Sequence, residues 1–342
     1  MALEGYEMSQ APCAVEVQNL SRHFGAFTAV DNISFCIHQG EVFGFLGPNG
    51  AGKTTTIRML CGILPPSGGT ARVLGVDVAR HPGQVKQQIG YMSQRFSLYE
   101  DLTVRENLEF YAGVYCVPWR QRSQHIDELI AMAGLAGRER ELAGRLAGGV
   151  RQRLALGCAI IHRPPILFLD EPTSGVDPAA RRRFWDMIYE FAAQGVTVMV
   201  TTHYMDEAER CHTVGLIHGG RLVALGAPDD LKAEQMAGQI IEIDCEPAMT
   251  AVDVLMLLPE VQEVALYGML LHVTVADAAS ATRPILNALA AARITVRSLE
   301  LAPPTLEDVF IALIRSGERR KGEQVRQGGG LTFDQDAGIK ED

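Results

Sequence analysis

The sequence has no hydrophobic run long enough to cross a membrane. Its longest apolar stretches, such as those at 166–169 and 196–200, are short, whereas a membrane-spanning helix needs about 20 such residues. Residues 1–12 carry Glu4 and Glu7 and lack the basic segment and apolar core of a secretory signal. We therefore expect a protein without membrane spans, either soluble and intracellular or bound peripherally to a membrane.

Positive charge is also in short supply. Lys and Arg number 31 against 41 Asp and Glu, which gives a formal net charge of −10. A protein that binds nucleic acid through its phosphates needs a basic surface. The composition therefore argues against a nucleic-acid footprint, and no nucleic-acid partner is expected.

The cysteines form no recognisable framework. There are seven, an odd number, far apart and without a C-x-x-C pair. Disulfide scaffolds and zinc sites usually show even numbers or close spacing. We therefore expect buried, reduced thiols at Cys13, Cys36, Cys61, Cys116, Cys158, Cys211 and Cys245.

Glycine, by contrast, is abundant, at 34 of the 342 residues. Glycine is typical of places where the backbone turns tightly or approaches a ligand. Hydrophobic residues make up 47% of the chain, enough for a folded protein. At about 150 residues per domain, the length predicts two domains.

The apolar pattern predicts an α/β fold followed by a smaller α+β domain. Apolar strands at 42–46, 166–169 and 196–201 alternate with helical segments, which indicates a parallel sheet covered by helices. Residues 100–165 are predicted to be mainly helical, beginning at a capping box of Thr103 and Glu106.

The domain limits follow from changes in this pattern. From about 240 to 299 the predicted order is β-α-β-β-α-β, that of a small ferredoxin-like domain. We assign residues 14–236 to the first domain and 237–314 to the second. Residues 315–342 are predicted to be a charged, disordered tail.

A glycine-rich loop follows the apolar strand at 42–46 and precedes a predicted helix. Its sequence matches the P-loop pattern G-x-x-x-x-G-K-[ST]. In such a loop backbone N–H groups surround phosphate oxygens, the helix N-terminus adds partial positive charge, the lysine adds a full charge, and the threonine hydroxyl binds Mg²⁺. The motif predicts nucleotide binding by Gly47, Pro48, Asn49, Gly50, Ala51, Gly52, Lys53, Thr54 and the adjacent Thr55.

Two carboxylates end the apolar segment at 166–169. Asp170 and Glu171 follow it directly. The Mg²⁺ held by the loop threonine also needs an aspartate, which we expect at the end of a neighbouring strand. A glutamate beside it can act as general base toward water, which contributes about 10²–10⁴-fold to a rate. The sequence thus predicts Asp170 at the metal and Glu171 as the catalytic base.

Several shorter motifs resemble those of the ABC ATPases and stand in the order of that family. Residues 146–152 resemble the signature Leu-Ser-Gly-Gly-Gln, and residues 173–177 resemble the D-loop. Gln94, His203 and Phe24 resemble the Q-loop glutamine, the switch histidine and the aromatic residue that stacks on adenine. The resemblance covers roughly residues 15–235.

This resemblance implies a fold, a set of roles and a dimer. The fold is that of a P-loop ABC ATPase, with antiparallel-β and helical subdomains. Thr54, Asp170 and Gln94 would surround Mg²⁺, and Glu171 and His203 would be catalytic on ATP. Two chains arranged head to tail would complete two ATP sites. The residues that act on the ATP of the second subunit would be Leu146, Ala147, Gly148, Gly149 and Gln152 of the signature, with Ser174 and Asp177 of the D-loop.

Three positions depart from the family pattern. The fifth signature position holds Val150 instead of glutamine, a common variation among the exporter subfamilies that this chain resembles. Ala147 stands where the family usually has serine, which removes a hydroxyl hydrogen bond to phosphate worth about 1.5–3 kcal/mol. We expect weaker nucleotide-driven dimerisation but retained activity. Phe24 replaces the usual tyrosine, at little cost because stacking needs only the ring.

The chain most resembles the ATP-binding subunits of ABC-2 drug exporters, such as daunorubicin-resistance ATPases. The basis is the runs at 44–56, 91–94 and 304–310. The resemblance implies membrane-spanning permease partners, pairing with a second copy or a paralogous ATPase, and a place on the cytoplasmic face of the inner membrane. The segment 95–103 resembles the region that contacts the membrane subunits, and the C-terminal domain would serve dimerisation or regulation.

Two other classes of function remain open. Non-transport ABC ATPases that act on ribosomes or nucleic acid usually carry two cassettes or a long coiled coil, and neither is visible here. A P-loop kinase or GTPase would leave residues 146–152 unexplained, and no Asn-Lys-x-Asp motif is present.

Overall fold

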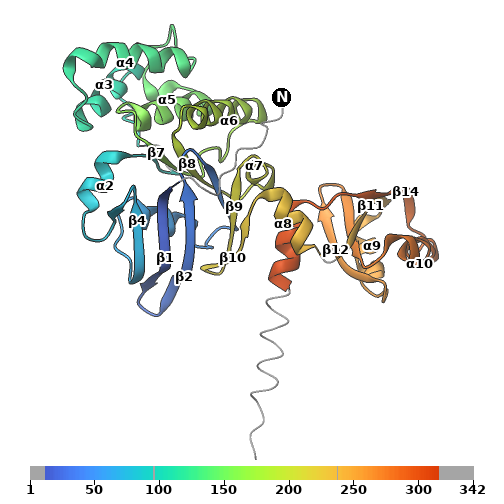
Figure 1. The fold of residues 1–342 in the computed structure, drawn as a ribbon. Coiled ribbons are helices and arrows are strands. Elements are labelled where there is room, and N and C mark those ends of the chain that lie inside the picture. Colours follow the sequence, from blue (N-terminus) through green and yellow to red (C-terminus); the bar gives the residue numbers. More distant parts are fainter. Residues whose placement is uncertain (1–11, 95–96, 237, 316–342) are drawn as a thin grey trace, which may run out of the picture. The chain divides into compact units, whose positions relative to one another are not determined.

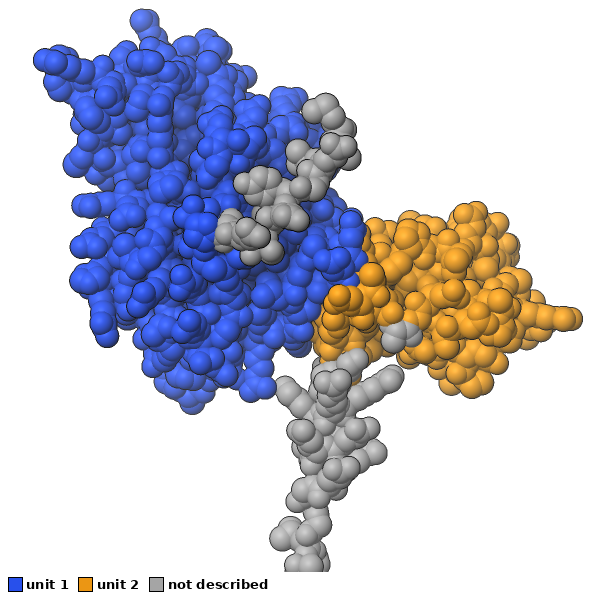
Figure 2. All heavy atoms as spheres, viewed as in Figure 1, with its two compact units in different colours: residues 1–231 blue, residues 232–342 orange. Residues whose placement is uncertain are grey.

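The computed structural model describes residues 12–94, 97–236 and 238–315 (Figure 1). The chain divides into two compact units, residues 1–231 and 232–342, coloured separately in Figure 2. The division falls within helix α8 (Pro228–Gln235). The predicted tail lies outside the described residues, except for residue 315. Within the described part, no helix combines the length and the apolar character needed to cross a membrane.

A six-stranded sheet with the strand order β10-β9-β3-β8-β7-β6 forms the centre of the first unit. Every residue of β3, β7 and β8 is buried, as expected for parallel strands covered by helices. The parallel strands are β3 (Val42–Leu46), β6 (Ile89–Met92), β7 (Ile166–Asp170), β8 (Thr197–Thr202) and β9 (Thr213–His218), and β10 (Arg221–Gly226) is antiparallel to β9.

A second, antiparallel sheet packs its apolar face against β3. Its order is β2-β1-β4-β5, from β1 (Cys13–Phe24), β2 (Phe27–His38), β4 (Gly68–Val73) and β5 (Val76–Asp77). Alternate residues of β2 face the core, because Ile33, Phe35 and Ile37 are all buried. The ring of Phe35 stacks on that of Phe43 with centroids 5.4 Å apart. This contact fixes β3 and thereby the start of the loop that follows it.

Helices cover the central sheet and form a separate helical region. Helix α1 packs on β7 and helix α6 on β8. Helices α3, α4 and α5 pack on one another (Figure 1). The capping box is confirmed: the Glu106 N–H donates to Thr103 Oγ1 and the Thr103 N–H donates to the Glu106 carboxylate. The helices of this unit are α1 (Lys53–Leu60), α2 (Pro82–Gln88), α3 (Val104–Val114), α4 (Trp119–Met132), α5 (Gly148–Ile160), α6 (Pro178–Ala193) and α7 (Met205–Ala208).

The cysteine prediction is wrong at three positions. Cys13 and Cys36 form a disulfide between β1 and β2, and Cys116 is exposed. Antiparallel pairing brings Cα atoms that are 23 residues apart in sequence to 6.0 Å, and linear spacing does not reveal this proximity. The remaining cysteines are buried and free as expected: Cys61, Cys158, Cys211 and Cys245.

The second unit has the predicted ferredoxin-like order. Its strands form one antiparallel sheet in the order β12-β13-β11-β14, and α9 and α10 pack against it. A last helix at 306–315 begins at a second capping box, in which Thr305 and Asp308 are paired. The other elements are β11 (Gln239–Glu246), α9 (Ala248–Leu255), β12 (Val261–Tyr267), β13 (Leu270–Val275), α10 (Ala278–Ala291) and β14 (Thr295–Ala302).

A charged cluster attaches this last helix to the sheet. His272 of β13 is 2% exposed. Its Nδ1 lies 3.0 Å from Asp308 Oδ1, and its Nε2 lies 3.3 Å from Glu242 Oε2. The hydrogen bond to Asp308 raises the pKa of His272; burial opposes this rise, and the charges of Asp308 and Glu242 add to it.

We predict that the cluster stabilises the second unit most in mildly acidic solution. A histidine with a raised pKa in the folded state contributes fully below its unfolded pKa of about 6.5, and the contribution is lost as pH rises through the folded pKa. His272→Gln should therefore lower the free energy of unfolding by about 1.5–3 kcal/mol near pH 6 and by less above pH 8. Thermal unfolding of both chains across this pH range tests the prediction, and a pH-independent difference would contradict it.

Candidate functional site

The loop at 47–52 joins the carboxyl end of β3 to the first turn of α1. Gly52 has φ +109°, and a Cβ there would lie 2.6 Å from the carbonyl oxygen of Ala29, so only glycine fits. Helix α1 begins at Lys53 without a side-chain cap and without an acidic residue in its first turn. Its N-terminal N–H groups and its positive end are therefore suited to an anion.

Lys53 is buried and makes three polar contacts. Its Nζ lies 2.7 Å from the carbonyl oxygen of Gly47, 3.1 Å from that of Pro48 and 3.0 Å from Glu171 Oε1. An ammonium group has three hydrogens to donate, so each can find an acceptor. The contact with Glu171 joins the loop to the end of β7.

Asp170 reaches the loop from β7, but β7 is not the strand next to β3. Strand β8 lies between them, which corrects the expectation of a neighbouring strand. Asp170 Oδ1 accepts from Thr54 Oγ1 at 3.0 Å and from Thr201 Oγ1 of β8 at 2.8 Å. The intervening strand thus supplies a hydroxyl that positions the carboxylate.

Burial is the main cause of the raised pKa of Asp170. The hydrogen bonds from Thr201 and Thr54 oppose this rise, and the adjacent charge of Glu171 adds to it. A cation beside Asp170 would therefore find a carboxylate whose charge the protein only partly compensates.

Glu171 is the point where the predicted residues meet. Its carboxylate lies 3.0 Å from Lys53 Nζ, accepts from Gln94 Nε2 at 3.2 Å and lies 3.3 Å from His203 Nδ1. Its backbone has φ +47°, a conformation that costs a non-glycine residue about 1–3 kcal/mol. Hydrogen bonds from its N–H to both oxygens of Thr201 hold it there.

The residues present fit Mg²⁺. The Thr54 hydroxyl and the Asp170 carboxylate offer the oxygen ligands that Mg²⁺ prefers. Lys53 pairs with Glu171 and leaves Asp170 without a cationic partner in the contacts described above. Gln94 directs its amide nitrogen toward Glu171, so in this geometry it orients the carboxylate, and its role as a metal ligand stays a prediction.

The segment at 146–152 forms the start of α5. Ala147 precedes the helix and gives it no side-chain cap. A Cβ on Gly148 would meet nothing within 4 Å, whereas one on Gly149 would lie 2.7 Å from Cβ of Ala180 in α6. Gly149 is thus required by packing within the chain, while the start of α5 at Gly148 faces open space. Leu146 is buried.

Gln152 is turned inward, unlike Ala147 and Gly148, which are exposed. It is fully buried, and neither atom of its amide group finds a hydrogen-bond partner among the described residues. The family resemblance implies that Gln152 acts on the ATP of a second subunit. The buried position found here does not expose its side chain to such an interface. The reason is helical periodicity, which turns position 152 inward from the exposed first turn.

The D-loop residues take different positions. Asp177 accepts hydrogen bonds from the N–H groups of Ala179 and Ala180 at 3.0 and 2.9 Å and caps α6. These backbone hydrogen bonds lower the pKa of Asp177. Ser174 is exposed, as an interface role would require. Within one chain, Asp177 therefore has a structural function.

A buried carboxylate that the sequence did not indicate connects this region. Glu207 of α7 is 0% exposed and accepts from Thr202 at 2.7 Å and from the hydroxyl of Thr173. Arg181 Nε of α6 lies 3.4 Å from the same carboxylate. An acidic residue in the first turn of a short helix usually faces solvent, so Glu207 by itself gave no sign of burial. The polar Thr201 and Thr202 at the end of strand β8, after its apolar residues, were the one indication in the sequence of a buried hydrogen-bond acceptor nearby.

Phe24 lies at the end of β1, beside the turn to β2. Its ring is 47% exposed, and the guanidinium of Arg22 lies 4.6 Å from the ring centroid. The exposed ring area leaves room for a base to stack, and adenine binding at this position stays a prediction. Asn49 and Gly50 are exposed, Ala51 is buried and Thr55 is half-buried.

Comparisons with known proteins identify the family. A family model described as ABC transporter matches residues 30–174, and one described as ATP-binding protein DrrA1-3-like, C-terminal domain, matches residues 226–314. The Nod factor export ATP-binding protein I of Paraburkholderia xenovorans is 38% identical over 301 residues, which cover 88% of this chain and 96% of that protein. This chain belongs to the ABC transporter family.

Other members of the ABC transporter family extend this result. Daunorubicin resistance ATP-binding protein DrrA3 of Streptomyces coeruleorubidus is 35% identical over 91% of this chain and 99% of its own length. The "Probable multidrug ABC transporter ATP-binding protein YbhF" of Escherichia coli is 49% identical over 232 residues, or 68% of this chain. The chain spans only 40% of the length of that relative. The predicted resemblance to daunorubicin-resistance ATP-binding proteins is confirmed.

Solved structures of the ABC transporter family share the fold of the first unit. An ATP-binding subunit of an ABC transporter superposes with a TM-score of 0.60 at 30% identity, covering 65% of this chain and 92% of that one. CbiO1 from Clostridium perfringens gives a TM-score of 0.60 at 26% identity over 65% and 91% of the two chains. The predicted P-loop ABC ATPase fold is confirmed.

The two glycines at the start of α5 should respond differently to alanine. We predict that Gly149→Ala lowers the free energy of unfolding by about 1–3 kcal/mol, because its Cβ overpacks against Ala180. Gly148→Ala is the matched control, since its Cβ meets open space and alanine favours a helix by up to about 1 kcal/mol. Chemical denaturation of the single chains tests this. Equal destabilisation by both substitutions would contradict it.

Proposed function

We propose that this chain is the ATP-binding and ATP-hydrolysing subunit of an ABC-2 type transporter that exports a drug or other hydrophobic compound. The observation that carries the proposal is the meeting of Lys53, Gln94 and His203 at the carboxylate of Glu171. The names of its relatives support export, since they include Nod factor export, linearmycin resistance and daunorubicin resistance ATP-binding proteins.

The hydrolytic roles follow from these contacts. The γ-phosphate of ATP would replace Glu171 as the anionic partner of Lys53, because both ligands would otherwise compete for the same ammonium hydrogen. The carboxylate released in this way is free to take a proton from water. Gln94 and His203 contact its Oε2 and so orient it. Mg²⁺, when bound at Thr54 and Asp170, neutralises charge on the phosphates.

In the same proposal, the start of α5 binds the ATP that is held by a second chain. Gly148 faces open space, and α5 has neither a side-chain cap nor an acidic residue in its first turn. Its N–H groups are therefore available to the γ-phosphate of ATP bound to a partner, with Ala147 and Ser174 at the same interface. The partner is a second copy or a paralogous ATPase, and the pair sits peripherally on the cytoplasmic face of the inner membrane.

We predict that Glu171→Gln lowers the rate of ATP hydrolysis by about 10²–10⁴-fold while ATP binding is retained. The amide keeps the size of the side chain but cannot accept the proton. Steady-state phosphate release and size-exclusion chromatography with ATP test this, the latter because the variant should accumulate as an ATP-bound dimer. Glu128→Gln on the surface of α4 is the control. Wild-type turnover by Glu171→Gln would overturn the catalytic assignment.

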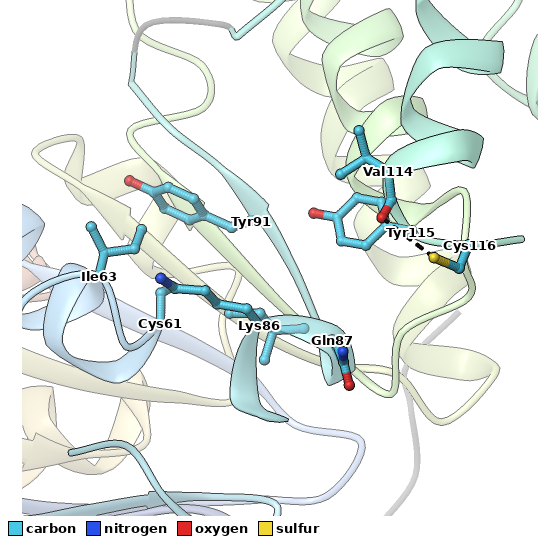
Figure 3. A pocket seen from close by; sticks show the side chains of 9 residues that line it. Cys61, Ile63, Lys86, Gln87, Tyr91, Val114, Tyr115 and Cys116 are labelled. Carbon is cyan, nitrogen blue, oxygen red and sulfur yellow. Dashed lines mark hydrogen bonds between the residues drawn. The ribbon is translucent and has the colours of Figure 1, made fainter. Parts of the chain in front are cut away.

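A cavity of about 640 Å³ offers a contact surface for the membrane subunits (Figure 3). It lies between the end of α1, the α2–β6 segment and the end of α3, and Tyr91 in its wall stands three residues before Gln94. Ile63 and Val114 line it and are 49% and 57% exposed. The lining residues are Cys61, Ile63, Lys86, Gln87, Ile89, Tyr91, Val114, Tyr115 and Cys116.

We propose that an apolar segment of the permease occupies this cavity and also contacts the segment predicted at 95–103. Of that segment, Phe96 lies outside the described residues, Leu98 is half-buried and Tyr99 is 45% exposed. Tyr91 is only three residues before Gln94 in the chain. A partner bound in the cavity would therefore shift Gln94, which orients the Glu171 carboxylate.

We expect Ile63→Glu to leave the ATPase rate of the ATP-binding subunit alone unchanged and to abolish its stimulation by permease subunits. An apolar permease segment would have to remove this carboxylate from water, which is costly even with Lys86 in the same cavity, so the permease would be excluded. Trp119→Glu, at a 76% exposed position of α4 outside the cavity, is the control. ATPase assays with the permease supplied in vesicles make the measurement. Retained stimulation of Ile63→Glu by the permease would contradict the contact. In a separate purification of the wild-type chain, co-purification with ribosomes would favour a non-transport ATPase.

A further inference from the structure

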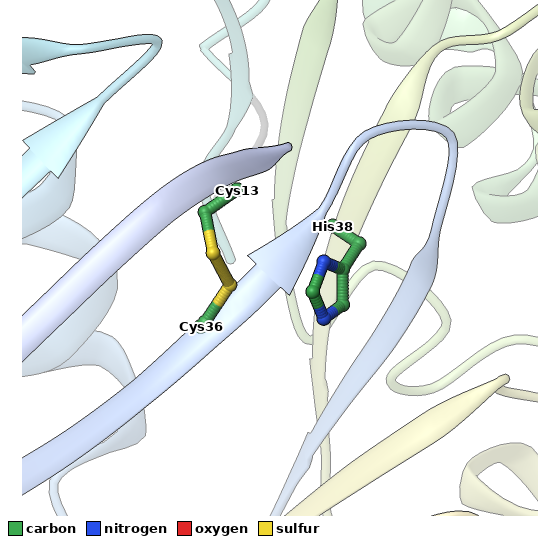
Figure 4. Close-up of side chains that lie close together, drawn as sticks. All are labelled: Cys13, Cys36 and His38. Atoms are coloured by element: carbon green, nitrogen blue, oxygen red, sulfur yellow. A yellow bond between two sulfur atoms is a disulfide. The ribbon is translucent and has the colours of Figure 1, made fainter. Parts of the chain in front are cut away.

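Three side chains with metal-ligating atoms meet on the outer face of the antiparallel sheet. Cys36 and His38 are two residues apart on β2 and therefore project from the same face. Cys13 of β1 is the register partner of His38. One ligand atom from each residue lies within 4.8 Å of the other two, and all three residues are half-buried (Figure 4).

We propose that, with the disulfide reduced, Cys13, Cys36 and His38 form a Zn²⁺ site. Two thiolates and an imidazole are a donor set that suits Zn²⁺ and not the hard cations Mg²⁺ and Ca²⁺. Tetrahedral Zn–S bonds of about 2.3 Å place the two sulfurs about 3.8 Å apart. The Cα separation of 6.0 Å lets both side chains reach one ion, and water takes the fourth position.

A small-molecule thiol can reduce the disulfide between Cys13 and Cys36. Two such thiols supply two electrons and two protons, the S–S bond between Cys13 and Cys36 breaks, and the reductant leaves as its own disulfide. Zn²⁺ then displaces a proton from each cysteine thiol and binds neutral His38. The small-molecule disulfide reverses these steps by thiol–disulfide exchange: it accepts two electrons and leaves as two thiols, the S–S bond between Cys13 and Cys36 forms again, and the ion is released. The same side chains therefore hold either a disulfide or a metal.

The surroundings suit a cation. The opposite face of β2 supplies Phe35 and Ile37 to the core, so the cysteine side chains are not needed for core packing. Glu16 is the register partner of Cys36, which places a carboxylate on the same face. The N–H of His38 donates to Glu41 Oε2 at 2.7 Å, which fixes the end of β2. His38 at the end of β2 lies shortly before the start of β3, whereas the loop at 47–52 follows the end of β3. The proposed zinc site is therefore separate from the nucleotide site.

The test titrates the full-length chain with Zn²⁺ alone against a chromophoric zinc chelator. The chain is first reduced with a phosphine, which is then removed without oxygen. We expect one zinc ion per reduced chain, loss of binding in Cys13→Ser and Cys36→Ser, weaker binding in His38→Gln and unchanged binding in Cys116→Ser. Cys116 is the matched control because it is the exposed free cysteine of this unit.

Two further measurements use the wild-type chain and so do not depend on how well a variant folds. The oxidised wild-type chain has the same sequence and should bind no zinc. In the reduced wild-type chain, zinc should protect Cys13 and Cys36 from alkylation while Cys116 still reacts. Equal zinc binding by the oxidised chain or by the Cys13→Ser/Cys36→Ser double variant would overturn the proposal, as would a reduced chain that binds no zinc.

Discussion

The buried ion pair of Lys53 and Glu171 is the interaction on which the rest of this site depends. Removing two charges from water costs several kcal/mol each unless every polar atom finds a partner. Two loop carbonyls accept hydrogen bonds from Lys53, Gln94 donates to the Glu171 carboxylate, and the Glu171 N–H donates to Thr201. His203 Nδ1 lies 3.3 Å from the same carboxylate without making a hydrogen bond to it. The strained backbone of Glu171 is held because so many contacts act on it together.

The order of strands explains how these contacts are made. Strand β8 separates β3 from β7, and its carboxyl end provides Thr201, Thr202 and then His203. Thr201 binds Asp170, while Thr202 binds Glu207, which in turn holds the segment that leads to α6. The adjacent residues Thr201 and Thr202 therefore connect the loop at 47–52, through Asp170, with the surface proposed to meet a second chain, through Glu207.

Two pairs of helices in the first unit differ at their N-termini. Helices α3 and α6 begin with side-chain caps that satisfy their first N–H groups. Helices α1 and α5 begin at glycine-rich turns without such caps, which leaves N–H groups and the positive end of the helix dipole for a ligand. In the proposed dimer, each ATP would therefore bind between the start of α1 of one chain and the start of α5 of the other.

The sequence by itself determined the glycine-rich loop at 47–52, the carboxylates at the end of β7, the capping box of α3 and the βαββαβ order of the second unit. These features depend on residues close together in the chain, where periodicity and spacing express the physics directly. Only the tertiary structure decided that Gln152 is buried, that Glu207 joins two threonines, that Asp170 reaches across β8, and that Cys13 meets Cys36 and His38. Those contacts come from strand pairing and helix packing between distant segments, and a linear pattern carries no record of which strands become neighbours.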